Sequence, residues 1–158
     1  KIVSFALTEP DHGSDAGRIK TKAIKVEGGY LITGQKRWIS NITLASYIVV
    51  QAKNVEEGNN IQSFVVNVPS KGLEIKTIKN KFSLRMSPTG DISFKEVFVP
   101  ENNRLEYGND FITGTVLILM KSRLGVAWCS ASGAIGAYEE CLRYCMTRKQ
   151  FGKPIASF

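Results

Sequence analysis

Over the first hundred residues, apolar and polar positions alternate in short runs that predict β-strands. Two such runs, within residues 23–33, flank Gly28-Gly29, a composition typical of a hairpin turn. Polar or proline-containing stretches separate the remaining apolar or alternating runs, which cover residues 47–52, 62–68, 73–78 and 92–99. Strands at this spacing, with turn residues between them, predict an antiparallel sandwich or a small barrel.

The periodicity changes near residue 110, where apolar residues begin to recur every three or four positions. No proline occurs between Thr113 and Thr147, and this segment predicts one long helix over about residues 113–147. Small residues such as Gly125 and Gly133 recur along it and suit close packing against another helix. Because one helix cannot bury its own apolar faces, we expect partner helices outside the sequence and a larger protein from which this chain comes.

Composition narrows the class of protein. Of the 158 residues, 43% are hydrophobic and 22% are charged, as in a globular chain rather than a disordered one. The three cysteines are an odd number confined to the helical segment, which argues against a disulfide framework and favours a reducing compartment. A single histidine, His12, excludes a multi-histidine metal site. No apolar run reaches the roughly 18 residues of a membrane span, so we expect none.

The net charge of +7 is spread along the chain and is not gathered in one tail. Nucleic-acid binding calls for denser basic clusters with interleaved aromatic residues, and the nearest segment, KTIKNK at 76–81, is better explained as a solvated strand or loop face. We therefore expect no nucleic-acid partner. A mild positive excess also suits a phosphorylated small molecule.

Three segments carry candidate chemistry, although each has a plainer explanation when taken alone. In FALTEPDHGSD (5–15), Pro10 and Gly13 bracket a turn that can present backbone N–H groups to a ligand, or simply turn the chain. In GQKRWISN (34–41), Trp38 offers a plate for a flat heterocycle, but a buried core tryptophan is the favoured reading of this segment alone. In RKQFGKP (148–154), Arg148 can clamp a phosphate or be an ordinary surface arginine.

In combination these segments lose their ambiguity. TEPDHGSD, GQKRWISN, FVVNVPSKGL, KFSLRMSPTGDISFKEVFVP and RKQFGKPIASF resemble, in order and over essentially the whole chain, the acyl-CoA dehydrogenase and acyl-CoA oxidase flavoprotein family. The resemblance implies a middle β-domain, a barrel or sandwich, in residues 1–105. Residues 106–158 would begin the C-terminal all-α domain with the first long helix of its four-helix bundle. KFSLRMSPTGDI and SRLGVAW are most similar to the glutaryl-CoA dehydrogenase branch and to plant-type short-chain peroxisomal acyl-CoA oxidases.

The resemblance also implies FAD as the cofactor and an acyl-CoA as the substrate. In such enzymes Thr8 would contact the edge of the flavin ring and Trp38 would lie along the isoalloxazine. Arg148 would reach the FAD pyrophosphate, typically of a neighbouring subunit, and Phe151 would pack at the adenosine. The full set of residues implied at FAD is Phe5, Ala6, Leu7, Thr8, Trp38, Ile39, Ser40, Arg148 and Phe151.

Two further positions are implied at the substrate, and the catalytic base is implied to lie elsewhere. Ser14 matches the residue at the thioester arm or pantetheine, and Arg123 matches the helix arginine near the adenine–ribose end. The reaction would be α,β-dehydrogenation to a trans-2-enoyl-CoA, with a carboxylate removing the α proton. In most of the family the base is a glutamate that would lie beyond Phe158. A minority place it one residue before the helix arginine, where this chain has Ser122. We therefore assign no catalytic residue and no metal site within the chain.

Several alternatives stay open at this point. The enzyme could pass electrons to an electron-transferring flavoprotein or, as an oxidase, to O₂ with formation of peroxide. A non-catalytic family member is a third possibility, although the intact FAD motifs count against it. We expect a homo-oligomer, a dimer or tetramer, that works in fatty-acid β-oxidation or amino-acid catabolism. Its expected location is intracellular, in the mitochondrial matrix or peroxisome of a eukaryote or in a bacterial cytoplasm.

Overall fold

The computed structural model describes all residues of the chain, Lys1–Phe158. They form two compact units, Lys1–Val116 and Leu117–Phe158, and each is described by itself. The two units divide after Val116, whereas the sequence predicts a domain boundary after residue 105. That predicted boundary stays a prediction.

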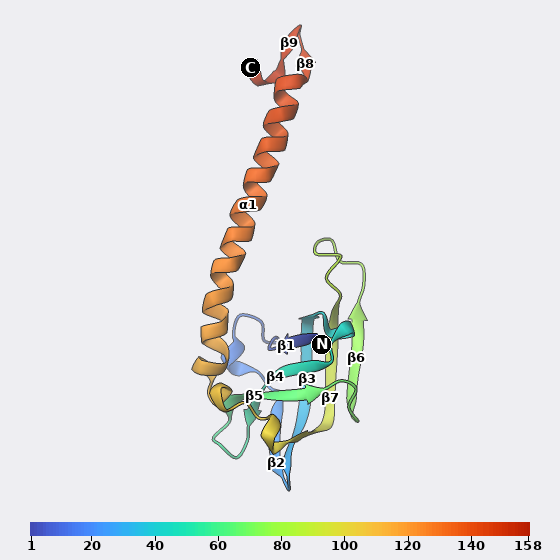
Figure 1. The fold of residues 1–158 in the computed structure, drawn as a ribbon, viewed down its shortest axis with the longest axis vertical. Helices are drawn as coiled ribbons and strands as arrows, with labels where there is room; N and C mark the ends of the chain where they lie inside the picture. The colour runs from blue at the N-terminus through green and yellow to red at the C-terminus, as the bar shows by residue number, and fades with distance from the viewer. The chain divides into compact units, whose positions relative to one another are not determined.

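The first unit is built on one curled, seven-stranded mixed sheet (Figure 1). Its strands are β1 (Val3–Ala6), β2 (Lys22–Val26), β3 (Gly29–Ser40), β4 (Tyr47–Asn54), β5 (Asn60–Asn67), β6 (Leu73–Ile78) and β7 (Thr89–Pro100). The order across the sheet is β1-β4-β2-β3-β7-β6, and β5 pairs with β4. A β-domain followed by a long helix is the predicted fold class, and the structure confirms it.

Each predicted strand is present, and the expected hairpin joins β2 to β3 through Gly28, whose φ of +76° favours glycine. The expectation of a purely antiparallel sheet is wrong. β1 and β2 both run parallel to β4, with Val3 opposite Tyr47 and Lys22 opposite Lys53. β1 was not among the predicted strands, because a run of four residues is too short to show a period and its parallel partner is distant in sequence.

The core of this unit lies on one face of the curled sheet. Inward side chains of β3, β4, β5 and β7 meet there, and all are almost fully buried; the largest apolar ones are Ile32, Ile48, Phe64, Ile92 and Phe94. The rings of Tyr30 and Phe64 pack edge to face, with 5.0 Å between their centroids. The apolar residues of the alternating runs therefore form this core, as the sequence pattern predicts.

The second unit contains α1 (Leu117–Thr147), a helix of 31 residues. The predicted helix over 113–147 is confirmed, except that its first turn is π-helical over Ile112–Val116, within the first unit. The side chain of Thr115 is buried there and its hydroxyl donates to Oε1 of Gln51 at 3.2 Å. After α1 come two short paired strands, β8 (Lys149–Gln150) and β9 (Lys153–Pro154).

The long helix is rich in apolar residues. The helical stretch Ile112–Thr147 is long and apolar enough to cross a membrane by length and composition alone. The expectation of no membrane span stays a prediction, because length and composition alone do not distinguish a membrane span from other apolar helices. A core helix of a helical domain passes the same test.

The buried ring of Phe64 gives a test of the core. Replacing Phe64 with alanine in the full-length protein should lower the free energy of unfolding by about 3–5 kcal/mol, since it leaves a cavity among fully buried neighbours. Denaturant-induced unfolding measures this loss. Phe98→Ala is the matched control, because the Phe98 ring is 50% exposed and its removal should cost clearly less. Equal losses for the two variants would contradict the assigned core.

Candidate functional site

The first two of the three candidate segments lie side by side in the first unit. The N–H of Arg37 donates to the C=O of Thr8 at 2.8 Å. The hydroxyl of Ser4 donates to the C=O of Ser40 at 2.9 Å. Direct hydrogen bonds therefore join β1 and the segment that follows it to the second half of β3.

The residues of the first segment differ in what they can offer to a ligand. The side chains of Ala6 and Leu7 are buried, so only their backbone groups are available for contacts outside the core. Phe5 and Thr8 are half-buried at the same end of β1. Ser14 is exposed in the loop that follows. Thr8 is thus the first side chain after β1 that can both hydrogen-bond and reach the surface of the unit.

Trp38 lies in an irregular part of β3. The pairing with β7 shifts register between Lys36 and Ile39, and Trp38 has a φ of +62°. A bulky residue in this region of φ is strained and persists only where its surroundings hold it. The Ile39 side chain is 3% exposed, whereas the Trp38 side chain is 54% exposed and packs beside the guanidinium of Arg37, 5.3 Å from the ring centroid. The reading of Trp38 as a core tryptophan is therefore wrong for this unit.

A cavity of about 500 Å³ opens beside the indole. Trp38 and Ser40 form one wall, and the segment after β6 forms the other; the remaining lining residues are Ile78, Lys79, Asn80, Lys81, Phe82, Ser83, Leu84 and Thr89. The ammonium of Lys81 donates to the hydroxyl of Thr89 at 2.7 Å and to the C=O groups of Leu84 and Ser87. The Lys81 side chain therefore holds this segment in place against β7. The volume is in the range of small-molecule sites.

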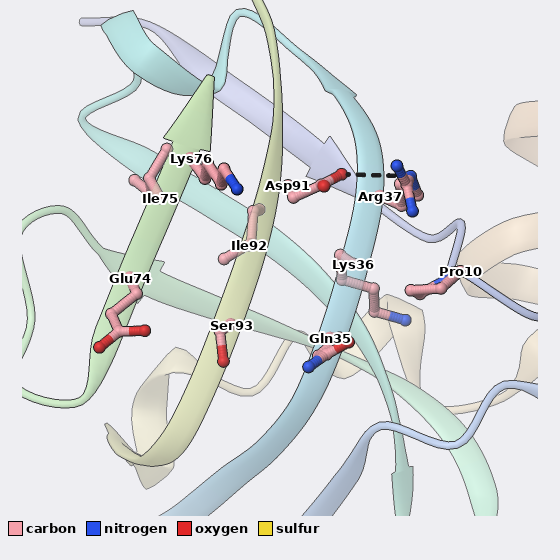
Figure 2. A pocket seen from close by; sticks show the side chains of 10 residues that line it. All are labelled: Pro10, Gln35, Lys36, Arg37, Glu74, Ile75, Lys76, Asp91, Ile92 and Ser93. Carbon is pink, nitrogen blue, oxygen red and sulfur yellow. Dashed lines mark ion pairs between the residues drawn. The ribbon is translucent and has the colours of Figure 1, made fainter. Parts of the chain in front are cut away.

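A second cavity, of about 470 Å³, lies over β3, β6 and β7 and reaches Pro10 (Figure 2). Charged groups of both signs line it, among them Arg37, Asp91, Glu74 and Lys76. Nε of Arg37 lies 3.6 Å from Oδ1 of Asp91, and the two side chains are 43% and 35% exposed. Opposite charges in such proximity offset each other, so this cavity presents no concentrated charge to a ligand.

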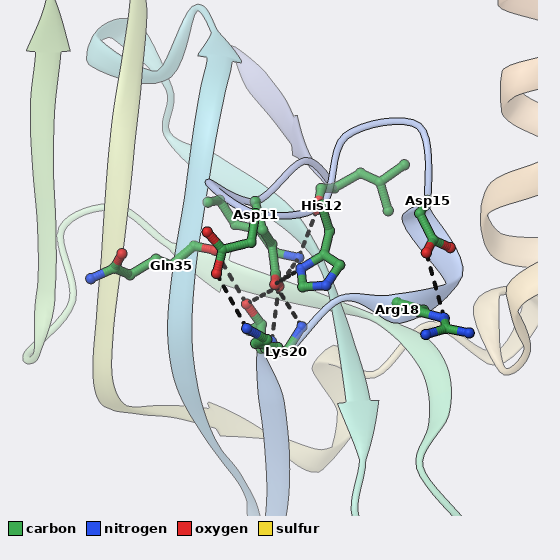
Figure 3. A network of polar contacts seen from close by, with 10 residues as sticks. Asp11, His12, Asp15, Arg18, Lys20 and Gln35 are labelled. Carbon is green, nitrogen blue, oxygen red and sulfur yellow. Dashed lines mark hydrogen bonds and ion pairs between the residues drawn. The ribbon is translucent and has the colours of Figure 1, made fainter.

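Between the two joined segments lies a buried ion pair that the sequence did not reveal. Nζ of Lys36 is fully buried and donates to Oε1 of Glu9 at 3.1 Å and to the C=O of Leu7 at 2.8 Å. Glu9, whose side chain is 5% exposed, also accepts from both groups of Thr21, with 2.9 Å from the N–H and 2.6 Å from the hydroxyl. The N–H of Lys20 donates to Oε2 at 2.6 Å. Figure 3 shows the polar contacts of this loop, with Asp11, His12, Asp15, Arg18, Lys20 and Gln35 labelled.

The environment shifts the pKa of both members of the pair. Burial lowers the pKa of Lys36 to about 8, and the charge and hydrogen bond of Glu9 offset part of that effect. Burial by itself would raise the pKa of Glu9, but the hydrogen bonds from Thr21 and Lys20 and the charge of Lys36 hold it below its ordinary value. Because the pKa of Lys36 falls from 10.5 on folding, its burial costs stability below about pH 8, and this cost is relieved between there and pH 10.5.

The other predicted residues belong to the second unit. Arg123 is exposed on α1, and the neighbouring Ser122 hydroxyl donates to the C=O of Leu119 at 2.9 Å. Arg148 follows the helix, with its N–H bonded to the C=O of Tyr144. Phe151 is 92% exposed in the turn between β8 and β9, where its φ is +51°. The predicted approach of these residues to the segments of the first unit stays a prediction. No group of three or more His, Cys, Asp or Glu side chains suits a metal ion.

Comparison with known proteins places this architecture in a family. Residues 4–97 match the acyl-CoA dehydrogenase middle domain, and residues 113–158 match the acyl-CoA dehydrogenase C-terminal domain. The chain therefore belongs to the acyl-CoA dehydrogenase family, as its motifs predict.

Individual relatives are similar along the whole chain. The caffeyl-CoA reductase–Etf complex subunit CarC of Acetobacterium woodii is 39% identical, over 100% of this chain and 42% of that protein. Mitochondrial isovaleryl-CoA dehydrogenase of Solanum tuberosum is 35% identical, over 99% of this chain and 39% of that protein. The chain thus spans about two fifths of the length of these relatives.

Solved structures agree with the sequence comparisons. The crystal structure of glutaryl-CoA dehydrogenase from Mycobacterium smegmatis superposes with a TM-score of 0.93 at 35% identity, covering 99% of this chain and 40% of that one. A structure of a glutaryl-CoA dehydrogenase from the same organism in complex with FADH2 also has a TM-score of 0.93, at 28% identity, with 99% and 40% of the chains covered.

Acid titration should expose the role of Glu9 in stability. Because its pKa is depressed in the folded state, ionised Glu9 contributes stability at pH values above 4.5, and the contribution is lost as the pH falls through the folded-state pKa. Glu9→Gln should destabilise the full-length protein at pH 7 by about 3 kcal/mol or more, because a buried charge loses its partner. It should also flatten the decline in Tm between pH 5 and pH 3.

Glu74→Gln is the control for this titration. Glu74 pairs with Lys95 at 3.1 Å, but both side chains are 67% exposed, so the change should cost about 1 kcal/mol or less. An acid decline in Tm as steep for Glu9→Gln as for the wild type would contradict the buried pair.

Proposed function

We propose that this chain is the middle part of an FAD-dependent enzyme that converts an acyl-CoA thioester to its trans-2-enoyl-CoA. One observation carries the proposal: the segment after β1 is hydrogen-bonded to the bulged part of β3, and in that bulge the exposed Trp38 indole lines a cavity of about 500 Å³. Membership of the acyl-CoA dehydrogenase family and the similarity to a solved FADH2 complex support the same cofactor.

The residues at this junction fit a flat, polar-edged ring. Trp38 supplies an accessible aromatic face, which suits stacking on a heterocycle. Ser40 lines the same cavity as Trp38, and Thr8, whose C=O accepts from the N–H of Arg37, offers a second hydroxyl. Phe5, Ala6, Leu7 and Ile39 are assigned backbone contacts and packing. Flavin, when bound, accepts the hydride from the β carbon of the substrate. Donors at the ring edge stabilise negative charge on the reduced ring, which favours substrate oxidation.

The remaining predicted contacts follow from the same proposal. We assign Arg148 to the FAD pyrophosphate and Phe151 to the adenosine, across the interface of a homo-oligomer. Both residues are accessible in this unit, as such contacts require. Ser14 and Arg123, which are also exposed, are assigned to the acyl-CoA. A guanidinium suits phosphate because it can donate two parallel hydrogen bonds.

No carboxylate of the chain is proposed as the catalytic base. Glu9 is unsuitable, because Lys36, Thr21 and Lys20 already occupy its two oxygens. On α1, the carboxylate of Glu140 is exposed and paired with Arg143. We therefore place the base outside this chain. For the electron acceptor we propose an electron-transferring flavoprotein, because the relative CarC is by its name a subunit of a complex with Etf.

The reaction can be tested on the full-length protein. It should purify with a yellow chromophore, and an acyl-CoA added under nitrogen should bleach the flavin absorbance. A colourless protein that takes up no FAD would contradict the proposal. Peroxide formed in stoichiometric amounts on admission of air would assign the oxidase reaction instead, whereas re-oxidation only by an electron-transferring flavoprotein supports the dehydrogenase. Bound flavin that no acyl-CoA bleaches would indicate a non-catalytic family member.

Trp38→Ala tests the position of the flavin. The loss of one stacked aromatic face should weaken FAD binding by about threefold to tenfold. The FAD content after gel filtration and the Kd from fluorescence quenching measure the change. Phe98→Ala serves as the control, because Phe98 has a similar exposure, 50% against 54%, and does not line the cavity. Unchanged FAD retention in Trp38→Ala would refute the assignment.

A further inference from the structure

The two segments that are proposed to hold the flavin are connected through one buried polar cluster. We call it the Glu9–Lys36 cluster, and it consists of Glu9, Thr21 and Lys36. Lys36 stands two residues before Trp38, and its ammonium donates to the C=O of Leu7 at 2.8 Å and to Oε1 of Glu9 at 3.1 Å. It therefore binds the residues on both sides of Thr8.

A backbone hydrogen bond completes this connection. The N–H of Arg37, the residue between Lys36 and Trp38, donates to the C=O of Thr8 at 2.8 Å. Three consecutive residues of the first segment, 7 to 9, are thus held by two consecutive residues of β3, 36 and 37. Loss of the Lys36 contacts would therefore free the backbone on both sides of Thr8 from the strand that carries Trp38.

Thr21 fixes the cluster from the other side. Its N–H and hydroxyl both donate to Oε1 of Glu9, at 2.9 and 2.6 Å. The hydroxyl fits because residue 34 is glycine: a Cβ on Gly34 would lie 2.5 Å from Oγ1 of Thr21 and 2.7 Å from its Cα. The φ of Gly34, +152°, also disfavours other residues. Oε1 of Glu9 therefore accepts three donors in a site that water does not reach.

Stability alone is a weak reason for such an arrangement. A buried ion pair pays a large desolvation cost, and apolar side chains of similar volume often stabilise a fold as well or better. A buried polar network instead fixes a unique geometry, because each partner has to be in place. Binding sites depend on that kind of second layer, which holds the contacting groups to within about 0.5 Å.

We propose that the Glu9–Lys36 cluster is a positioning device that fixes the backbone of Thr8 relative to the part of β3 that carries Trp38, so that both residues meet the flavin in a fixed geometry. The proposal deepens the proposed function and rests on it. Lys36, Glu9 and Thr21 are positioning residues, since they act through Thr8 and Trp38 and not on the flavin itself. Through the cluster, the buried side chains of Glu9, Thr21 and Lys36 would contribute to cofactor binding indirectly.

Lys36→Met in the full-length protein is the first test. Methionine keeps much of the length of the side chain and loses the ammonium. The Kd for FAD should rise by about tenfold to a hundredfold, because small misplacements of contacting groups are costly. The absorption maximum of the bound flavin and its midpoint potential should shift with it. Lys95→Met is the control, because Lys95 belongs to the exposed pair with Glu74 and should leave all three values unchanged.

Thr21 provides a milder, matched pair of variants. Thr21→Val keeps the shape of the side chain and removes the hydroxyl that donates to Glu9, so the Kd for FAD should rise by about threefold to tenfold. Thr21→Ser keeps the hydroxyl and should restore a Kd and a flavin spectrum close to those of the wild type. This pair decides the question if Lys36→Met fails to fold.

The possible outcomes distinguish a failure of the positioning role from a failure of the proposed FAD site. Variants with a lower Tm but with wild-type Kd, spectrum and potential would show that the cluster only stabilises the fold, and this would overturn the proposal. If the wild type binds FAD and Thr21→Val is indistinguishable from Thr21→Ser, the proposal falls while the proposed function stands. If the wild type binds no FAD, the proposed function fails and the positioning role fails with it.

Discussion

Burial of one ammonium group constrains the site more than any other interaction in the first unit. An unpartnered Lys36 inside the sheet would cost too much free energy to remain charged, so it needs acceptors. Its acceptors are the C=O of Leu7 and the carboxylate of Glu9, which is 27 residues away in the sequence. The chain leaving β1 is therefore held against β3, and the position of Thr8 follows from the solvation of Lys36.

The bulge at Trp38 allows Lys36 to be buried while Trp38 is exposed. In a regular strand, side chains two residues apart lie on one face, so burial of Lys36 would bury Trp38 as well. The register shift between Lys36 and Ile39 breaks this rule: Ile39 is buried and Trp38 is exposed. One bulge thus lets β3 keep a charged partner for Glu9 inside and an aromatic plate outside. Bulges commonly redirect side chains in this way next to binding sites.

These two features also mark the limit of what the sequence predicts. The run LEIKTI gives the bounds of β6 at 73–78, and the proline-free stretch gives the end of α1 at Thr147, because periodicity is a local property. A bulge has no such signature, which is why GQKRWISN taken alone suggested a core tryptophan. Lysine and glutamate are normally solvated, so nothing in the sequence separates Lys36 and Glu9 from the other charged residues of the chain. Parallel pairing of β1 with β4 is likewise set by distant contacts.

In α1 the sequence predicts the helix correctly, but its apolar side chains and glycines have no packing partner within this chain. No residue of α1 is buried, and side chains such as Leu124, Trp128 and Ile135 are at least 60% exposed. A Cβ built on Gly125, Gly133 or Gly136 meets no atom within 4 Å, so no close contact within the chain requires glycine at these positions. Glycine weakens a helix by about 1 kcal/mol relative to alanine, which makes three of them costly without a packing partner. The expected packing against further helices would explain these glycines, because small residues let neighbouring helices approach closely.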